Sequence, residues 1–310
     1  MISWRYHVVS IVAVILAFGL GILAGTSVVG DRFVRDLEKN YNEARQERDA
    51  ALQLVEFYEG VAVQLQPTLR DGVLVGERAI VVTMDGVDGQ ASRVVEELTA
   101  AGAEVLATLR VTRSLVETDV EENAAVVERI LGVPGSDPDD LRSDVTDALA
   151  VRLAFGPVDE QDVLEAFLEE GLVTADRDLD EEDLLAVGGP GQLVVIAAGG
   201  RAPAVAPEPE LFLMPFAARL VQLDVTAAAV GPTEDAYGFV AAVREENEIP
   251  DCSMVTVDDV DLAIGAIALA MGLERLLDDP DPAFRAGGDY GVDGDSIVPG
   301  ADEPPDSCRT

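Results

Sequence analysis

The chain opens with a long apolar run. Residues 8–29 read VVSIVAVILAFGLGILAGTSVV, with no charged side chain and three hydroxyl side chains as the only polar ones. As a helix, a run of this length spans slightly more than the roughly 30 Å of a bilayer's hydrocarbon core. Trp4 and Tyr6 precede it, where interfacial aromatic side chains are common. The pattern predicts a single transmembrane anchor within residues 1–30.

Two other interpretations of this run are a buried helix and a cleaved signal peptide. A helix on a soluble core is usually amphipathic, whereas this run is apolar on all sides. It is also longer than a signal-peptide core, and Ala24-Gly25-Thr26 is a poor cleavage site. We therefore favour an uncleaved anchor, in which the spacing of Gly21 and Gly25 suits a helix contact in lipid. The large domain that follows is expected outside the cytoplasm.

Residues 31–66 have the pattern of a polar helix with one apolar stripe. The stripe alternates spacings of four and three, which is the seam of a heptad repeat broken by one arginine. Such a seam fits a self-associating stalk or a lone helix packed on the body. We favour a coiled-coil-like stalk at residues 31–68, ended by Pro67 and Gly72, through which the chain forms a homo-oligomer. The seam consists of Leu37, Tyr41, Ala44, Arg48, Ala51, Val55, Tyr58, Ala62 and Leu65.

The rest of the chain alternates between short apolar runs and amphipathic stretches. Apolar runs rich in β-branched residues predict strands buried on both faces, and helical spacing of apolar residues predicts the helices between them. The acidic stretch 174–185 predicts a solvated loop or a helix entrance. Strands are expected at residues 78–84, 104–109, 192–198, 225–230 and 253–257, and helices at 90–101, 120–131, 141–155, 160–170, 209–223, 234–246 and 261–273.

This alternation defines the fold class. Strands alternating with helices predict an α/β domain over residues 69–278, with an open, mostly parallel, Rossmann-like sheet covered by helices on both faces. Residues 261–273 are very apolar but too short to span a membrane, so they are expected to pack on the sheet. Residues 279–310 are rich in Pro, Gly and Asp and are expected to form an irregular tail.

Charge and histidine content exclude several classes of function. The 59 Asp and Glu residues against 21 Lys and Arg give a formal net charge of -38. Such a field repels phosphate groups, so nucleic acid is excluded as a partner. The sole histidine, His7, lies at the expected membrane edge, which leaves the body without a Ser-His or Cys-His pair. We expect no enzymatic activity, and we assign no catalytic and no cofactor-binding residue.

Ligands of open α/β sheets bind at the carboxyl ends of the strands. The turns expected there read DGVDG at 85–89, GGR at 199–201, GP at 231–232 and DD at 258–259, and none is a GxGxxG or P-loop fingerprint. We interpret the glycines as turn residues and the aspartates as helix caps or solvated groups. The alternative is a divalent cation held by Asp85, Asp88 and Asp259.

Copper prefers softer ligands than carboxylates. The close pair of that kind is Cys252 and Met254, two residues apart on one side of an expected strand. A place in the core explains this pair better, because free Cys and Met are commonly buried. Cys252 and Cys308 are the two cysteines, and both a bond between them and two free thiols are consistent with the sequence. No metal ligand is assigned.

Both ends of the chain resemble a known family. The N-terminus MISWRYHVVSIVAVILAFGLGILAG resembles the opening of the actinobacterial MctB copper transport family, a source that the Arg-rich, almost lysine-free composition also fits. Residues 287–291, GGDYG, followed by Ile297-Val298-Pro299, are similar to that family's C-terminal end. The resemblance implies an envelope protein, often of the outer membrane, that limits intracellular copper. It implies a copper ion as the transported or bound species and supplies no copper ligands.

Together these observations predict a non-enzymatic envelope protein, anchored in a lipid bilayer through residues 8–29, that contributes to copper transport or homeostasis. The alternative is an envelope scaffold whose acidic body binds another protein and has no copper role. A third hypothesis is a ligand-binding or hydrolytic domain that uses the aspartates at the strand ends.

Overall fold

The computed structural model describes residues 4–157, 162–201, 206–250, 253–278, 287–291, 293–294, 296–297 and 299. In its first helix, α1, it describes the side chains at residues 4, 6–22, 39–42, 44–46, 48–50 and from 52 onward. The chain divides into two compact units, Met1–Gly60 and Val61–Thr310. We call the second unit the body. Both cysteines lie outside the described residues, so their redox state stays open.

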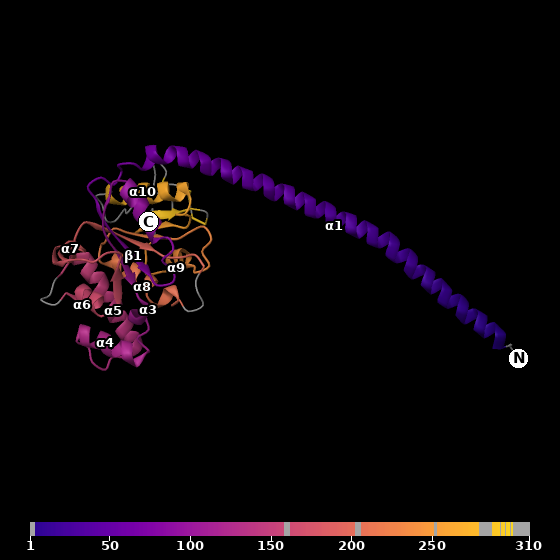
Figure 1. Cartoon of the computed structure of the whole chain (residues 1–310), viewed down its shortest axis with the longest axis horizontal. Helices are drawn as coiled ribbons and strands as arrows, with labels where there is room; N and C mark the ends of the chain where they lie inside the picture. Colours follow the sequence, from indigo (N-terminus) through magenta and orange to yellow (C-terminus); the bar gives the residue numbers. More distant parts are fainter. Residues whose placement is uncertain are drawn as a thin grey trace. The chain divides into compact units, whose positions relative to one another are not determined.

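One helix, α1 (Trp4–Arg70), contains both the predicted anchor and the predicted stalk (Figure 1). It continues for 67 residues because the sequence has no proline before Pro67. Pro67 lies in the last turn, where its missing N–H removes only one hydrogen bond, and the helix ends two residues beyond the predicted boundary at 68. Gly72 follows with a left-handed φ of +86°.

The predicted anchor is helical, but the structure does not establish that it spans a membrane. Among the residues that the structure describes, no helix is both long enough and apolar enough to cross a bilayer. The described side chains of the apolar run end at Ile22, whereas the run itself continues in the sequence to Val29. The anchor therefore stays a prediction.

The body is built on a mostly parallel sheet, as the sequence predicts. Its strand order is β3-β2-β1-β4-β5-β6-β7, and every neighbouring pair is parallel except β2 with β3. The central strands β1, β4 and β5 are almost entirely buried, which fits the doubly covered position of parallel strands. The strands are β1 (Arg78–Met84), β2 (Glu104–Val111), β3 (Val173–Ala175), β4 (Gln192–Ala197), β5 (Ala227–Val230), β6 (Val255–Val257) and β7 (Gly288–Tyr290).

Helices cover both faces of this sheet (Figure 1). Alternate residues of β1 point to opposite faces, so Ile80 and Val82 join one hydrophobic core while Ala79 and Val81 join the other. The larger core contains residues of α3 (Arg113–Val116), α4 (Glu121–Leu131), α5 (Pro138–Phe155), α6 (Val163–Glu169), α8 (Leu213–Gln222) and α9 (Phe239–Glu245). The smaller core contains residues of α2 (Ala91–Ala100) and of α10 (Ala263–Asp278), the very apolar helix expected to pack on the sheet.

The sequence does not predict the edge strand β3. It lies at the start of the acidic stretch expected as a loop or helix entrance, and α7 (Glu181–Ala186) forms later in that stretch. β3 has only three residues, and hydrogen bonds just beyond its two ends attach it to the β2 segment. Thr112 N–H donates to Leu172 C=O at 3.0 Å, and Asp176 N–H donates to Thr108 C=O at 3.1 Å. A strand this short carries no periodic signal of its own.

The prediction of an irregular tail is wrong at β7. Gly288–Tyr290 pairs in parallel with β6, and Tyr290 is almost completely buried. The segment contains no β-branched residue, so its order comes from its neighbours. Gly272 of α10 leaves the space that the phenol ring occupies, because a Cβ there would lie 3.2 Å from Tyr290 Cε2.

Thr83 of β1 is a polar exception within the core. It lies on the same face as Ala79 and Val81, is completely buried, and its hydroxyl has no hydrogen-bond partner among the described residues. Burying a hydroxyl without a partner costs about 1–3 kcal/mol.

We expect Thr83→Val to stabilise the body, because it replaces the unbonded hydroxyl with a methyl group of similar shape. The free energy of unfolding should rise by about 1 kcal/mol, measured by urea denaturation of the full chain in detergent. Thr99→Val, at an exposed position on α2, is the matched control and should change stability little. A loss of stability in Thr83→Val would mean that the hydroxyl has a partner.

Candidate functional site

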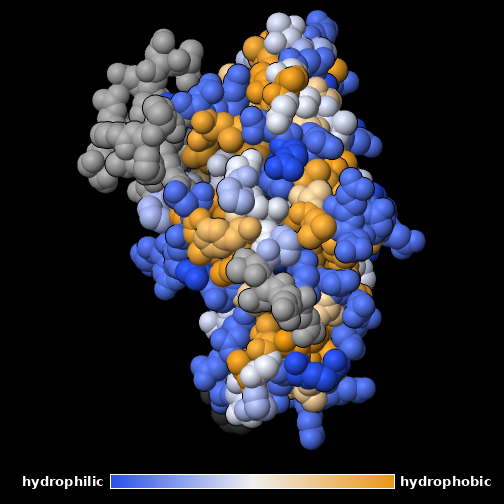
Figure 2. Space-filling model, turned by 90° about the vertical axis from the view of Figure 1, so that its left-hand side faces the viewer, coloured by the Kyte–Doolittle hydropathy of each residue, from blue (hydrophilic) through white to orange (hydrophobic). Residues whose placement is uncertain are grey.

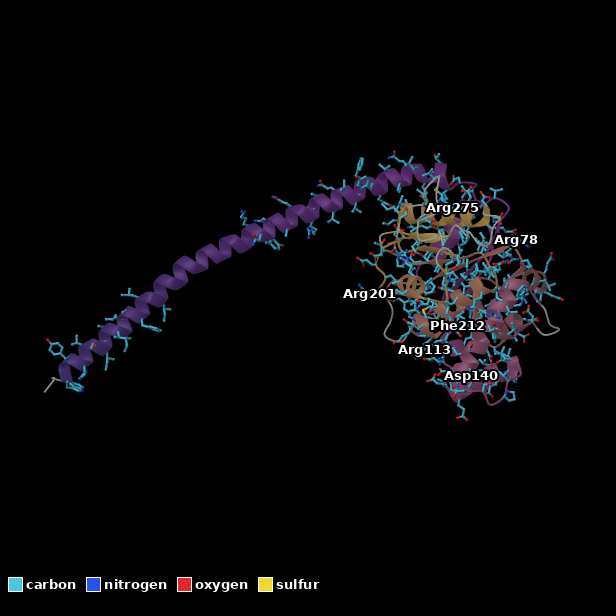
Figure 3. All side chains as sticks on the ribbon, turned by 180° about the vertical axis from the view of Figure 1, so that it is seen from behind. Arg78, Arg113, Asp140, Arg201, Phe212 and Arg275 are labelled. Atoms are coloured by element: carbon cyan, nitrogen blue, oxygen red, sulfur yellow. The ribbon has the colours of Figure 1, made fainter. Side chains whose placement is uncertain are left out.

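The strand order reverses between β1 and β4, which is where doubly wound sheets bind their ligands. Figure 3 labels Arg78 at the start of β1 and Arg201 just beyond the end of β4, on opposite sides of the body. At the carboxyl side, Gly199 N–H donates to Val87 C=O at 3.1 Å, and Val87 is buried. The two loops that would flank a ligand are therefore bonded directly to each other.

Asp85 and Asp88, two members of the predicted cation site, share an arginine. Arg110 near the end of β2 places Nη2 2.9 Å from Asp88 Oδ2 and Nε 4.0 Å from Asp85 Oδ1. All three side chains are partly exposed, so this pairing contributes little to stability. The arginine balances part of the negative charge that a divalent cation would need.

Asp259, the third member of the predicted cation site, lies far from the other two. It follows β6, which is separated from β1 by β4 and β5, and three strand spacings of about 4.8 Å amount to roughly 14 Å. Within the described residues, no group of three His, Cys, Asp or Glu side chains is placed to hold a metal ion. The structure thus does not assemble Asp85, Asp88 and Asp259 into one site.

Two aspartates that the sequence interpretation did not assign cap turns at this edge. Asp235 Oδ1 accepts hydrogen bonds from Gly200 N–H at 2.9 Å and Tyr237 N–H at 3.0 Å. Asp261 Oδ1 accepts from the backbone and the hydroxyl of Thr233, at 2.7 and 2.9 Å. Of the aspartates expected as caps or solvated groups, Asp259 is instead 2% exposed and Asp258 is 12% exposed and paired with Arg244.

The soft side chains do not form a described copper site either. Met254 is 3% exposed and belongs to the larger core, as expected for a buried methionine. Its predicted companion Cys252 lies outside the described residues. His7 is exposed on α1.

A polar network surrounds Arg244 of α9. Its guanidinium donates to Thr256 Oγ1 at 2.8 Å, to Asp258 Oδ2 at 2.7 Å and to the carbonyl oxygen of Tyr290 at 2.8 Å. Thr256 in turn donates to Asp289 Oδ1 at 2.8 Å. We call these five residues the Arg244 cluster. Because its members come from α9, β6, β7 and the turn after β6, it ties the last strand to the body.

The glycines beside the Arg244 cluster explain the GGDYG segment in physical terms. Gly291 has a φ of +117°, and a Cβ there would lie 1.8 Å from Asp258 Oδ1. A Cβ at Gly288 would lie 2.7 Å from the Tyr290 hydroxyl oxygen. Burial raises the pKa of that phenol above its ordinary value. The segment that carries the family resemblance is therefore a closely packed structural strand.

Arg152 of α5 is a buried arginine whose role the sequence did not predict. It is 3% exposed and binds Asp162 through two hydrogen bonds of 2.7 Å, a bidentate pair. It also donates to the carbonyl oxygens of Leu184 and Val187. Arg152 thus joins α5 to α6 and α7. No pattern in the sequence separates such an arginine from a solvated one.

An acidic groove of about 580 Å³ lies along α5, the 3-10 helix η1 (Pro209–Leu211) and α8. Its two arginines are already bound, Arg219 to Asp147 and Arg142 to Asp139. The remaining carboxylates leave the groove negatively charged, and it can attract cationic groups. Its acidic lining residues are Asp139, Asp144, Asp147, Glu210 and Glu248.

We expect Arg244→Met to loosen β7 strongly, because it leaves Asp258 buried without its cation. Both side chains are 12% exposed, and breaking such a pair costs about 3–5 kcal/mol. Urea denaturation should show the loss, and hydrogen exchange should show faster exchange at residues 288–290 than in wild type.

The matched control is Arg129→Met, which breaks the exposed pair with Glu170 and should cost less than about 1 kcal/mol. If Arg244→Met fails to fold, Arg244→Lys keeps the charge but not the three-way donor geometry and should show the same exchange pattern more weakly. Equal effects of the two methionine variants would contradict a stabilising role of the Arg244 cluster.

Comparison with known proteins places the chain in a family. Residues 1–297 match the family described as "Copper transport outer membrane protein, MctB". The proteins named "Copper transporter MctB" of Mycobacterium bovis and Mycobacterium tuberculosis are each 26% identical to it over 301 residues, covering 89% of this chain and 93% of theirs. The match extends from the apolar N-terminus through β7. The chain therefore belongs to the MctB family, as the resemblance of its two ends predicts.

Proposed function

We propose that this chain is a single-span envelope protein that contributes to copper transport or homeostasis, with its acidic body outside the cytoplasm. The observation that carries the proposal is the family match over residues 1–297, which includes the apolar N-terminus, the long helix and the body. The relatives that this chain matches over 93% of their length are named copper transporters. In this proposal, the folded body contributes a strong negative field, since residues 61–310 hold 51 of the 59 acidic side chains.

The exposure of α1 supports the anchor. In the first unit, described apolar side chains from Val8 to Ile22 are exposed, among them Phe18 at 72% and Leu20 at 67%. A soluble protein rarely presents a continuous apolar surface of this size to water. A lipid bilayer removes that cost, since it surrounds the helix with hydrocarbon while the helix satisfies its own backbone hydrogen bonds.

The copper role is proposed without a fixed ligand set. The described residues hold no cluster suited to a metal ion, and Cu(I) prefers sulfur ligands over the carboxylates that dominate this surface. Figure 2 shows one face of the molecule, on which hydrophilic residues surround separate apolar patches. We propose that the acidic body attracts copper cations by its field.

The alternative is an envelope scaffold that binds a partner and has no copper role. The acidic groove along α5 and α8 favours this alternative, because its net charge suits a basic partner and needs no metal. Copper content of cells separates the two hypotheses, since only the first one links the chain to copper.

We expect deletion of the gene in its host to raise cell-associated copper and to lower copper tolerance. Elemental analysis of washed cells and growth on graded copper measure the two effects, with zinc content as the control metal. Expression of the full chain should restore both values. If copper content and tolerance are unchanged, the copper role is dropped and the scaffold hypothesis stands.

We expect Leu16→Asp combined with Leu20→Asp to release the chain from membranes. Each carboxylate near the centre of a spanning helix costs about 2.5–3.5 kcal/mol. Alkaline carbonate extraction followed by sedimentation should find wild type in the pellet and the double variant in the supernatant. Leu52→Asp, on the same helix but outside the apolar run, is the matched control and should stay in the pellet. Release of wild type would contradict the anchor.

A further inference from the structure

The part of α1 between the apolar run and the body exposes a stripe of apolar side chains. Tyr41 is 66% exposed, Val55 57% and Tyr58 61%, and all three belong to the heptad seam of the sequence. A helix in a protein gains most of its stability from packing its apolar face, so we expect another molecule to pack against this seam.

The structure shows where the seam meets the body. Ala62, which the heptad spacing assigns to the same seam, is 6% exposed and lies in the body. One turn on, Gln66 Nε2 donates to Glu97 Oε2 of α2 at 2.8 Å, and Arg70 Nη1 donates to the same atom at 2.6 Å. At Ala62, Gln66 and Arg70 the helix therefore contacts its own body, while Leu65, the last seam residue, is 48% exposed. The described seam residues that precede these contacts lie within residues 41–58.

Charge selects the occupant. Residues 31–60 hold eight acidic and five basic side chains, whereas residues 61–310 hold 51 of the 59 acidic and 15 of the 21 basic ones. The net charge is thus -3 for residues 31–60 and -36 for residues 61–310, so two copies repel each other far less at the helical segment than at the body. A seam with a 3.5-residue period packs best against another helix of the same period. A second copy of this chain meets both conditions at residues 41–58.

We propose that residues 41–58 of α1 form a parallel, in-register coiled coil with the same residues of a second copy. The parallel direction rests on the proposed function, because two copies anchored in one membrane by their N-termini present their seams in the same direction. The coil holds two acidic bodies together through the helical segment, where eight acidic and five basic side chains leave a net charge of -3.

Arg48 defines the register of this coil. It is a seam residue, and its guanidinium binds Asp49 through contacts of 2.6 and 3.1 Å. Arg45 lies 3.8 Å from the same carboxylate. In register, the two Arg48 side chains face each other in one layer, each with a carboxylate beside it. A single polar layer of this kind lowers stability but fixes register, as buried polar residues do in other coiled coils.

Cysteine cross-linking of the full chain tests the proposal. In a background with Cys252→Ser and Cys308→Ser, single cysteines are placed on the seam (Ala44→Cys or Val55→Cys) and on the opposite side of the helix (Asn42→Cys or Gln53→Cys). The chain is purified in detergent and oxidised with diamide, so no copper is present. A disulfide requires Cβ atoms about 3.5–4.5 Å apart, which only facing seam positions allow.

We expect Ala44→Cys and Val55→Cys each to form covalent dimers at least tenfold faster than Asn42→Cys and Gln53→Cys. Equal rates at all four positions would overturn the proposal, and so would the absence of dimers at both seam positions. An antiparallel coil is also excluded by dimers at both positions, because it would pair residue 44 only with residue 55.

A second variant keeps the test independent of folding. Arg48→Leu should increase the dimer fraction in sedimentation velocity at equal concentration, because an apolar pair replaces the polar layer; a decreased fraction would contradict the seam assignment. Failure of the anchor appears in carbonate extraction and failure of the copper role in cell-associated copper. Neither changes the cross-linking pattern, so the proposals can fail separately.

Discussion

The burial of the central sheet on both faces is the constraint on which the body depends. Because β1, β4 and β5 are apolar on both sides, each face must be covered by helices, and two hydrophobic cores result. Most polar residues then lie on the outer surfaces of the helices and in the turns, with Thr83 and Arg152 among the buried exceptions. At the carboxyl edge, the loops that could have held a ligand are bonded to each other and capped by their own aspartates. A hydrogen bond thus links the two loops at the reversal of strand order, where related folds bind cofactors.

The scarcity of basic residues gives each arginine of the body a particular importance. Most of them neutralise a specific carboxylate, and two of these pairs are buried: Arg152 joins three helices, and Arg244 holds the last strand. A guanidinium suits these positions because it carries several donors in one plane and stays charged when buried. The carboxylates that remain unmatched face water. These unmatched carboxylates give the body its negative field, because most of its arginines are already paired with other carboxylates.

The strands with long apolar runs and the helices between them could be predicted from the sequence because burial on both faces leaves a strong pattern. β3 and β7 could not, since three residues carry no period and their order comes from other parts of the chain. Thr108 and Thr112 bind the residues that flank β3, and Arg244 and β6 bind β7. The same holds for the Arg244 cluster and for Arg152, whose burial depends on contacts between distant segments. The alternative of a cation site is not assembled, because residues at the ends of β1 and β6 are similar in sequence character but separated by two strands. The heptad pattern was visible in the sequence, whereas the burial of its member Ala62 against the body was not.

The position of β7 also sets the order in which the body is completed. Its residues come from the end of the chain, yet they pair with β6 and provide the carbonyl group that Arg244 binds. Until they arrive, β6 is an open sheet edge, and such edges associate readily with other strands. Because synthesis begins at the N-terminus, these residues are delivered late. The final sheet therefore closes only after almost the whole polypeptide has been delivered, and the interval before closure is when the body is most exposed to misassembly.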